Sequence, residues 1–303
     1  MIKTEGLTKI FEKYTALNNV DCTIDSGCIC GIVGSNGAGK STFLRLLAGV
    51  YKADSGSIYI DDMPVFDNPE VKAKIAYVPD ELYFLPSATI EKMMELYASI
   101  YPKYNKEKCI ALANKLKLNI RQNINTFSKG MKRQASTILA LAAETEYIFF
   151  DETFDGLDPV IRNFVKGIIC EEVYERKATA IITSHSLREL EDICDQLALL
   201  HKGGLILQND IENLKTSHCK IQVAFDYEYD ESLFKDIEHL RFKKTGSVSS
   251  MIVKGNIDET TNTIASMKPI LMDILPLTLE EVFSYEMETL SYNFDLDLSG
   301  KEA

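Results

Sequence analysis

Long apolar runs and an excess of positive charge are both missing from this 303-residue sequence. No run approaches the roughly 18 apolar residues that a membrane-spanning helix requires, and no apolar signal segment stands at the start. The 33 Lys and Arg residues face 45 Asp and Glu residues, for a net charge of −12. Because nucleic-acid backbones are bound by basic surfaces, we expect no nucleic-acid partner, and we expect a chain that does not cross a membrane by itself.

Zinc-type cysteine spacings are missing as well. The seven cysteines include no C-x-x-C pair, and Cys28 and Cys30 fall on one side of a segment expected to be a buried strand. Reduced thiols in the core of a cytoplasmic protein are the simpler interpretation. The length favours about two domains, and an apolar content of 46% is sufficient for a full core.

The first part of the chain, residues 1–214, alternates strand-like and helix-like segments, which predicts an α/β fold. The first 25 residues and residues 57–60 alternate polar and apolar positions, as in an antiparallel β subdomain. Apolar stripes at helical spacing predict a helical subdomain over about residues 85–144. Five apolar segments are typical of buried parallel strands: Cys28–Val33, Lys74–Val78, Tyr147–Phe150, Thr179–Thr183 and Leu197–Leu200.

The pattern changes after this part, and residues 215–287 predict a small, separate α+β domain. A half-exposed strand is expected from Ile221 and a helix over Ser232–Leu240. A final helix is expected to begin with a capping box formed by Thr278–Glu281. The acidic residues 288–303 predict a flexible tail.

A glycine-rich loop follows the first buried strand. It reads G-S-N-G-A-G-K-S, and a helical pattern begins directly after it. In this setting the loop amides can wrap nucleotide phosphates, and the helix N-terminus adds positive potential. Lys40 can reach the β- and γ-phosphates, and the Ser41 hydroxyl can ligate Mg²⁺. The expected nucleotide contacts are Gly34, Ser35, Asn36, Gly37, Ala38, Gly39, Lys40, Ser41 and Thr42.

Two acids end the apolar strand Tyr147–Phe150. Since ligands of parallel sheets bind at the carboxyl edge, Asp151 is placed to hold Mg²⁺ and Glu152 to activate the attacking water as a general base. His185 follows another apolar strand at the same edge, and we expect it to contact the γ-phosphate. Behind it, Ser186–Glu189 has the pattern of a second capping box.

A further phosphate contact is expected where residues 127–131 open a long helical pattern. Ser128 suits an N-cap, and Gly130 lets a phosphate approach the backbone. Lys129 stands between them, where its charge opposes the helix dipole but would favour a nearby phosphate.

Over residues 1–213 these landmarks resemble the ATP-binding subunit of an ATP-binding-cassette (ABC) transporter, and especially the bacterial exporter subunits that carry an extra C-terminal domain. The resemblance implies a P-loop NTPase fold with a mixed sheet core, ATP hydrolysis, and ATP and Mg²⁺ as cofactors. It implies two partners, an integral-membrane transporter subunit and a second ATPase subunit in a homodimer or heterodimer. It also implies a cytoplasmic, peripheral location on the inner face of the cell membrane.

The resemblance assigns roles to further residues. Ser128, Lys129 and Gly130 match the signature segment, which in the family contacts ATP held by the other subunit.

Five other positions fall where the family has landmarks. Phe11 is favoured as the ring that stacks on adenine, with Tyr14 as the alternative. Asp158 falls in the match to the D-loop, and His185 matches the switch histidine. Asp80 stands where the family usually has Gln, and its carboxylate can ligate Mg²⁺.

Rival classes lack their own features in this sequence. A GTPase would carry an Asn-Lys-x-Asp motif. A DNA-repair ATPase of the same superfamily would carry a coiled-coil insertion or zinc modules, and a translation factor would carry a second cassette. None of these features appears in the sequence. A non-transport regulatory or resistance ATPase remains the alternative function.

Overall fold

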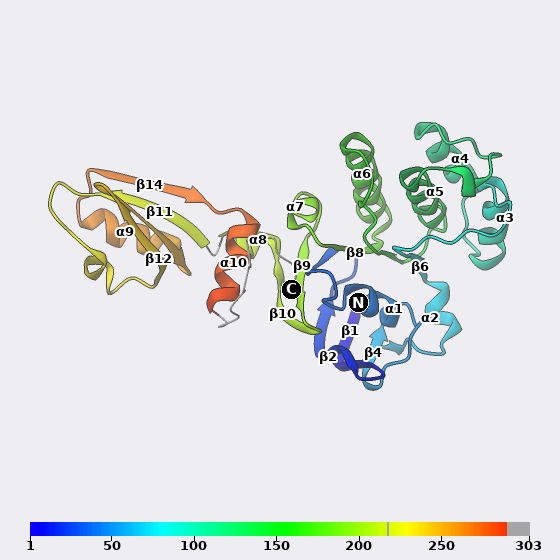
Figure 1. Ribbon diagram of the computed structural model, residues 1–303, viewed down its shortest axis with the longest axis horizontal. Helices are drawn as coiled ribbons and strands as arrows, with labels where there is room; N and C mark the ends of the chain where they lie inside the picture. Colours follow the sequence, from blue (N-terminus) through cyan, green and yellow to red (C-terminus); the bar gives the residue numbers. More distant parts are fainter. Residues whose placement is uncertain (217, 290–303) are drawn as a thin grey trace. The chain divides into compact units, whose positions relative to one another are not determined.

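The computed structural model describes residues 1–216 and 218–289. Contacts divide the chain into two compact units, the first spanning Met1–Asn209 and the second beginning at Asp210 (Figure 1). Of the predicted flexible tail, residues 288 and 289 belong to the last helix, and residues 290–303 lie outside the described part.

A six-stranded sheet is the centre of the first unit. Its strand order is β10-β9-β3-β8-β7-β6, and the pairs from β9 to β6 are parallel. Every residue of β3, β7 and β8 is buried, which confirms the apolar segments predicted as central strands. The strands are β3 (Ile29–Val33), β6 (Ile75–Val78), β7 (Tyr147–Phe150), β8 (Thr179–Ser184), β9 (Gln196–His201) and β10 (Gly204–Asp210).

An antiparallel sheet covers the first helix of this unit. Its order is β2-β1-β4-β5, and its strands are β1 (Ile2–Phe11), β2 (Tyr14–Ile24), β4 (Ser55–Ile60) and β5 (Met63–Pro64). Leu7 and Leu17 from this sheet share one buried cluster with Phe43 of α1 (Lys40–Leu47) and with Ile32 of the central sheet. The helix after the glycine-rich loop is therefore anchored on both sides.

Three α-helices lie between β6 and β7 in the sequence, within the range proposed as a helical subdomain. They are α3 (Ile90–Ile100), α4 (Lys106–Lys115) and α5 (Lys129–Leu141), which gather together in Figure 1, and the short turn η1 (Ile124–Thr126) precedes α5. Thr89, Asn105 and Ser128 cap the three α-helices through side-chain oxygens that accept backbone N–H groups. Residues 133–141 of α5 are all buried, so this helix forms the centre of the subdomain.

Three further helices complete the first unit. They are α2 (Pro69–Ala73), α6 (Pro159–Arg176) and α7 (Leu187–Leu190). The predicted capping box at the start of α7 is wrong, because the Ser186 side chain makes no capping bond. Instead the Ser184 hydroxyl accepts from the Ser186 amide at 3.0 Å and donates to Glu189 at 2.7 Å.

The second unit is an α+β arrangement. Its antiparallel sheet has the order β12-β13-β11-β14, with strands β11 (His218–Ala224), β12 (His239–Thr245), β13 (Val248–Lys254) and β14 (Leu271–Pro276). Helices α8 (Ile211–Thr216), α9 (Ile257–Ser266) and α10 (Leu279–Thr289) accompany it. Thr278 and Glu281 exchange the two bonds of the predicted capping box, with Thr278 N–H to Glu281 at 2.9 Å and Glu281 N–H to Thr278 Oγ1 at 3.3 Å.

The predicted helix over Ser232–Leu240 is wrong. The chain makes only the short 3₁₀ turn η2 (Glu231–Phe234) and then enters β12 at His239. Phe234 is fully buried among aromatic rings that include Phe225 and Phe242, and Leu240 pairs with Ile252 across the sheet. Tertiary packing of these rings overrides the local helical spacing.

Within the described ranges, no helix has the length and apolar character that would let it cross a membrane.

Candidate functional site

The glycine-rich loop takes a conformation that depends on two of its glycines. Gly39 has φ +104° and is the N-cap of α1, and a Cβ atom there would lie 2.6 Å from the Ala16 carbonyl oxygen. At Gly34 a Cβ atom would lie 2.3 Å from the Leu200 carbonyl oxygen. Real Cβ atoms do not approach so closely, so both positions require glycine. No side chain caps α1, which leaves its first amides available to an anion.

A pocket of about 490 Å³ lies over this loop. Polar groups from the loop, from the ends of β6 and β7, and from the turn after β8 line it, so that one cavity gathers residues from across the first unit. The lining residues are Tyr14, Ala16, Asn36, Gly37, Ala38, Gly39, Lys40, Ser41, Thr42, Asp80, Glu152, Asp155 and His185.

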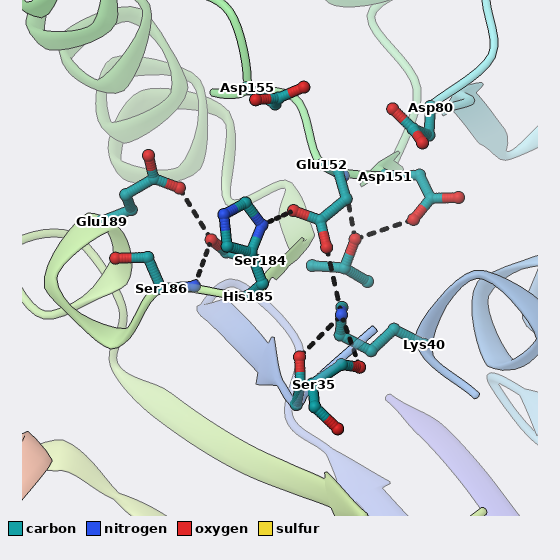
Figure 2. Close-up of polar contacts among 12 residues, drawn as sticks. Ser35, Lys40, Asp80, Asp151, Glu152, Asp155, Ser184, His185, Ser186 and Glu189 are labelled. Atoms are coloured by element: carbon teal, nitrogen blue, oxygen red, sulfur yellow. Dashed lines mark hydrogen bonds and ion pairs between the residues drawn. The ribbon is translucent and has the colours of Figure 1, made fainter. Parts of the chain in front are cut away.

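Lys40 places its ammonium group against the loop and the second acid. Its side chain is 6% exposed, and Nζ donates to the Gly34 carbonyl at 2.7 Å and to the Ser35 carbonyl at 3.2 Å. Nζ also lies 3.1 Å from Oε1 of Glu152 (Figure 2). The charge of this lysine is therefore directed at the part of the pocket where the loop amides converge.

Asp151 and Ser41 form the candidate metal position. The Ser41 hydroxyl donates to Asp151 Oδ1 at 3.0 Å, and Thr183 donates to the same oxygen at 2.8 Å. Asp151 is fully buried, and its other oxygen accepts from the Tyr77 hydroxyl at 3.3 Å. Burial and the nearby Asp151 carboxylate raise the pKa of Tyr77 well above its usual value, so Tyr77 stays a neutral donor.

This donor set fits Mg²⁺. A carboxylate and a hydroxyl are oxygen ligands of the kind that Mg²⁺ takes, and Mg²⁺ is commonly held by one or two protein ligands with phosphate oxygens completing the shell. Among the residues that the structure describes, no cluster of three or more His, Cys, Asp or Glu side chains could hold a metal by itself. A metal at Ser41 and Asp151 would thus share its coordination with a phosphate.

Glu152 lies between Lys40 and His185. Its Oε2 atom is 3.0 Å from His185 Nδ1 (Figure 2). The backbone N–H of Glu152 donates to Thr183 Oγ1 at 2.9 Å. The side chain of Glu152 is 12% exposed and that of His185 is 51% exposed. The carboxylate is therefore held in position at the pocket wall, with the half-exposed imidazole on its outer side.

Tyr14, and not Phe11, lines the pocket. The Tyr14 hydroxyl donates to the Gly37 carbonyl at 3.0 Å. Phe11 packs edge-on against Tyr51, with ring centroids 5.4 Å apart and an interplanar angle of 72°. The structure therefore favours Tyr14 over Phe11 as the neighbour of a bound base.

The predicted signature segment, Ser128 to Gly130, does not line this pocket, although one of its residues contacts a lining residue. Ser128 caps α5 by accepting from the Met131 amide at 3.2 Å, and Lys129 pairs with Asp155 at 2.7 Å. That hydrogen bond from Lys129 holds the pKa of Asp155 below its usual value. Gly130 lies so close to the loop after β7 that an added Cβ would be 3.0 Å from the carbonyl oxygen of Gly156.

Asp158 and Asp80 have partners of their own. Asp158 is the N-cap of α6, where its carboxylate accepts from the amides of Val160 and Ile161 at 3.0 Å each. Asp80 lines the pocket, but Oδ1 accepts from the guanidinium of Arg133 at 2.8 Å. The assignment of Asp80 as a metal ligand stays a prediction, and an ion pair competes with it.

Sequence reasoning missed three residues that the structure brings to the site. Ala16 lines the pocket two residues after Tyr14 on β2, where strand alternation could have found it. Asp155 lines it three residues after Glu152. Thr183 bonds both neighbouring acids, and nothing in its sequence context distinguishes it from an ordinary strand residue.

Comparison with known proteins identifies the family. The family model described as ABC transporter matches residues 17–155. YtrB, an ABC transporter ATP-binding protein of Bacillus subtilis (strain 168), is 32% identical over 283 residues, which cover 93% of this chain and 97% of YtrB. The chain belongs to the ABC transporter ATP-binding proteins.

Two further similarities agree with this family. The bacitracin transport ATP-binding protein BcrA of Bacillus licheniformis is 29% identical over 224 residues, or 73% of each chain. A solved structure of an ATP-binding subunit of an ABC transporter matches with a TM-score of 0.66 and 25% identity, over 71% of this chain and 92% of that one. The predicted P-loop ABC ATPase fold is confirmed, and the chain is an ATPase of this family.

Proposed function

We propose that this ABC ATPase binds Mg-ATP in the pocket over residues 34–42 and hydrolyses it to power an integral-membrane transporter partner. The observation that carries the proposal is the position of Glu152, whose carboxylate is held between Lys40 and His185 at the wall of a pocket floored by the loop. A general base must lie within reach of the phosphate-binding groups, and this arrangement supplies that geometry.

Each loop residue has a role in the proposal. The amides from Gly37 to Thr42 would bind the phosphate oxygens, and Lys40 would balance their charge. Tyr14 would lie beside the adenine. When bound, Mg²⁺ neutralises charge on the phosphates, and Ser41 and Asp151 are the residues that would hold it.

Hydrolysis would depend on three side chains. Glu152 would accept a proton from the attacking water, and His185 would orient Glu152 and contact the γ-phosphate. Thr183 fixes the backbone between the two acids through its bonds to Asp151 and to the Glu152 amide. This division of roles would leave Asp151 for the metal and Glu152 for the water.

The signature segment would act on a second ATPase subunit. Ser128, Lys129 and Gly130 lie outside the pocket of their own chain and at the start of α5, where amides and a lysine charge could meet a phosphate from another subunit. ATP would then close a homodimer or heterodimer of ATPase subunits, and reopening after hydrolysis would move the membrane partner. Asp158, on the neighbouring loop, would face the same interface.

Transport by an exporter is the proposed use of this cycle, with the chain peripheral on the cytoplasmic face of the cell membrane. The similarity to BcrA, a bacitracin transport ATP-binding protein, supports a transport role for this chain. The alternative is a regulatory or resistance ATPase that acts on a membrane sensor.

Two measurements test the proposal. Calorimetry should show Mg-ATP binding to the full chain and its loss in Lys40→Ala, because the neighbouring amides cannot replace a point charge on the phosphates. Unchanged nucleotide affinity in Lys40→Ala would rule out this loop as the site. Purification from membranes in mild detergent should recover a multi-span membrane subunit, and ATPase-dependent movement of a solute by the pair would separate transport from sensing.

A further inference from the structure

Arg133 is a buried cation at the metal end of the site. Its side chain is 1% exposed, and it extends from α5 to the ends of two central strands. NH1 donates to the Pro79 carbonyl at 3.1 Å and to the Asp151 carbonyl at 3.4 Å, and NH2 donates to Asp80 Oδ1 at 2.8 Å. One guanidinium group thus joins the helical subdomain to the residues that follow β6 and β7.

The Arg133 bond to the Asp151 carbonyl acts on the peptide group between the two acids. The carbonyl of that peptide accepts from Arg133, and its N–H, which belongs to Glu152, donates to Thr183 at 2.9 Å. Glu152 has φ +48°, a left-handed conformation that non-glycine residues seldom adopt. Hydrogen bonds on both sides of the peptide therefore keep it in the orientation that directs the Asp151 and Glu152 side chains.

Asp80 supplies the charge that Arg133 needs. A cation removed from water must be paired, and leaving it unpaired in the interior is costly. Asp80 is 44% exposed, so its carboxylate can be solvated without Arg133, whereas the guanidinium cannot. If Asp80 moved to a metal beside Ser41, it would leave this buried cation without its carboxylate.

Asp80 also lines two cavities. It lines the pocket over the loop and a second pocket of about 420 Å³, which Lys129, Lys132 and Arg133 line on the α5 side. The carboxylate therefore has positive charge on its α5 side, and its observed bond is directed there. In the absence of a bound cation, Coulomb attraction favours this placement over one toward Asp151, whose carboxylate is of like sign.

We propose that Arg133 is a positioning residue for hydrolysis, and that Asp80 is its counterion and not a ligand of the metal. The inference rests on the proposed function for the metal position at Ser41 and Asp151. In this role Arg133 would bind neither ATP nor the metal and would act by fixing the Asp151–Glu152 peptide and the Pro79–Asp80 peptide. A shift in the position of α5 would therefore be transmitted to Asp151 and Glu152 through the Arg133 side chain.

The test uses the full chain and four variants: Asp80→Asn, Arg133→Lys, Arg133→Met and the double variant Asp80→Asn/Arg133→Met. Four quantities are measured, namely kcat for ATP, KM for ATP, the Mg²⁺ concentration for half-maximal ATPase, and the temperature of unfolding. Ser41→Ala is the positive control for the metal, because loss of a ligand should raise the Mg²⁺ requirement about tenfold or more.

The counterion role predicts that Asp80→Asn lowers the unfolding temperature and leaves the Mg²⁺ requirement within about twofold of the unmodified chain. In the Arg133→Met background the same substitution should have no further effect on unfolding, because no buried cation remains to be paired. A Mg²⁺ requirement that Asp80→Asn raises about tenfold in both backgrounds would instead make Asp80 a metal ligand and overturn the inference.

The positioning role predicts a split between kcat and KM in Arg133→Lys. Lysine keeps the charge and the pair with Asp80 but lacks the planar fork, so kcat should fall about fivefold or more while KM for ATP stays within about twofold. A lower unfolding temperature with unchanged kcat would make Arg133 a structural residue only and would overturn the inference. If Ser41→Ala leaves the Mg²⁺ requirement unchanged, the proposed metal position fails, and the Arg133→Lys result still decides the role of Arg133.

Discussion

Replacement of Glu152 by Gln is the sharpest test of the proposed hydrolysis. The two side chains have nearly the same shape, and the Gln carbonyl can still accept from Lys40, which lies 3.1 Å from Oε1. The contact to His185 at 3.0 Å can be kept by the amide as well. The substitution therefore removes basicity and leaves the position of the side chain largely intact.

The expected loss of ATPase rate follows because the substitution changes the basicity of the side chain and not its position. Loss of a positioned base costs roughly 10²–10⁴ in rate, which corresponds to about 3–5 kcal/mol of barrier. The weaker bond to Lys40 should lower the free energy of unfolding by only about 1–2 kcal/mol, because one charge-assisted hydrogen bond becomes a bond to a neutral acceptor. The variant should therefore fold, bind ATP and turn over very slowly.

Glu189→Gln is a matched control for this measurement. Glu189 is 13% exposed against 12% for Glu152, and it bonds Ser184 at 2.7 Å and Arg162 at 3.0 Å without lining the pocket. Steady-state phosphate release at saturating Mg-ATP, with calorimetry of ATP binding, compares the two variants. A Glu152→Gln variant with a normal rate, or a Glu189→Gln variant that loses as much, would refute the assignment of the base.

Three further predictions concern other parts of the chain. Gly130→Asp should spare ATP binding by the monomer and block ATP-dependent dimerisation in sizing experiments, because it places a carboxylate against the partner's phosphate; Gly130→Ala, whose Cβ would lie 3.0 Å from the Gly156 carbonyl oxygen, controls for the steric effect. A chain that ends at Thr216 should fold and bind Mg-ATP, and a folded truncation that binds no ATP by calorimetry would contradict the two-domain proposal. Asp61→Asn should lower the free energy of unfolding by about 1–2 kcal/mol at pH 7, since hydrogen bonds led by that from Tyr147 outweigh burial and lower the pKa of Asp61 to about 2. The difference should shrink as the pH falls from about 4 toward 2 in urea unfolding, and a constant difference would exclude this carboxylate as the cause.

Much of the fold could be predicted because its strands are buried on both faces. Tyr147–Phe150 is apolar throughout, so its ends and the acids after it could be located from the sequence. The capping pair Thr278 and Glu281 is equally local, since both of its bonds lie within one turn. Where the determining contacts are short-range or the pattern is uninterrupted, sequence reasoning suffices.

The failures occur where distant residues decide. Ser184 takes the bonds that the capping pattern assigned to Ser186, because the end of β8 brings its hydroxyl next to Glu189. Phe234 is drawn into an aromatic core formed by strands on either side of it in sequence, which ends the predicted helix. Arg133 is a residue that the sequence analysis did not single out, because only the tertiary fold buries it against two strand ends.

The contacts of Lys40 also bear on the order of events in the pocket. Its ammonium group has three N–H donors, and three acceptors already surround it: two loop carbonyls and Glu152. A phosphate would be a fourth acceptor, so it must displace one of them. The carbonyls belong to the backbone, whereas Glu152 contacts Lys40 through a side chain, so Glu152 would be the acceptor that leaves while its other oxygen stays bonded to His185. Arrival of the substrate would therefore free the very carboxylate that acts on it, which ties the availability of the base to occupancy of the loop.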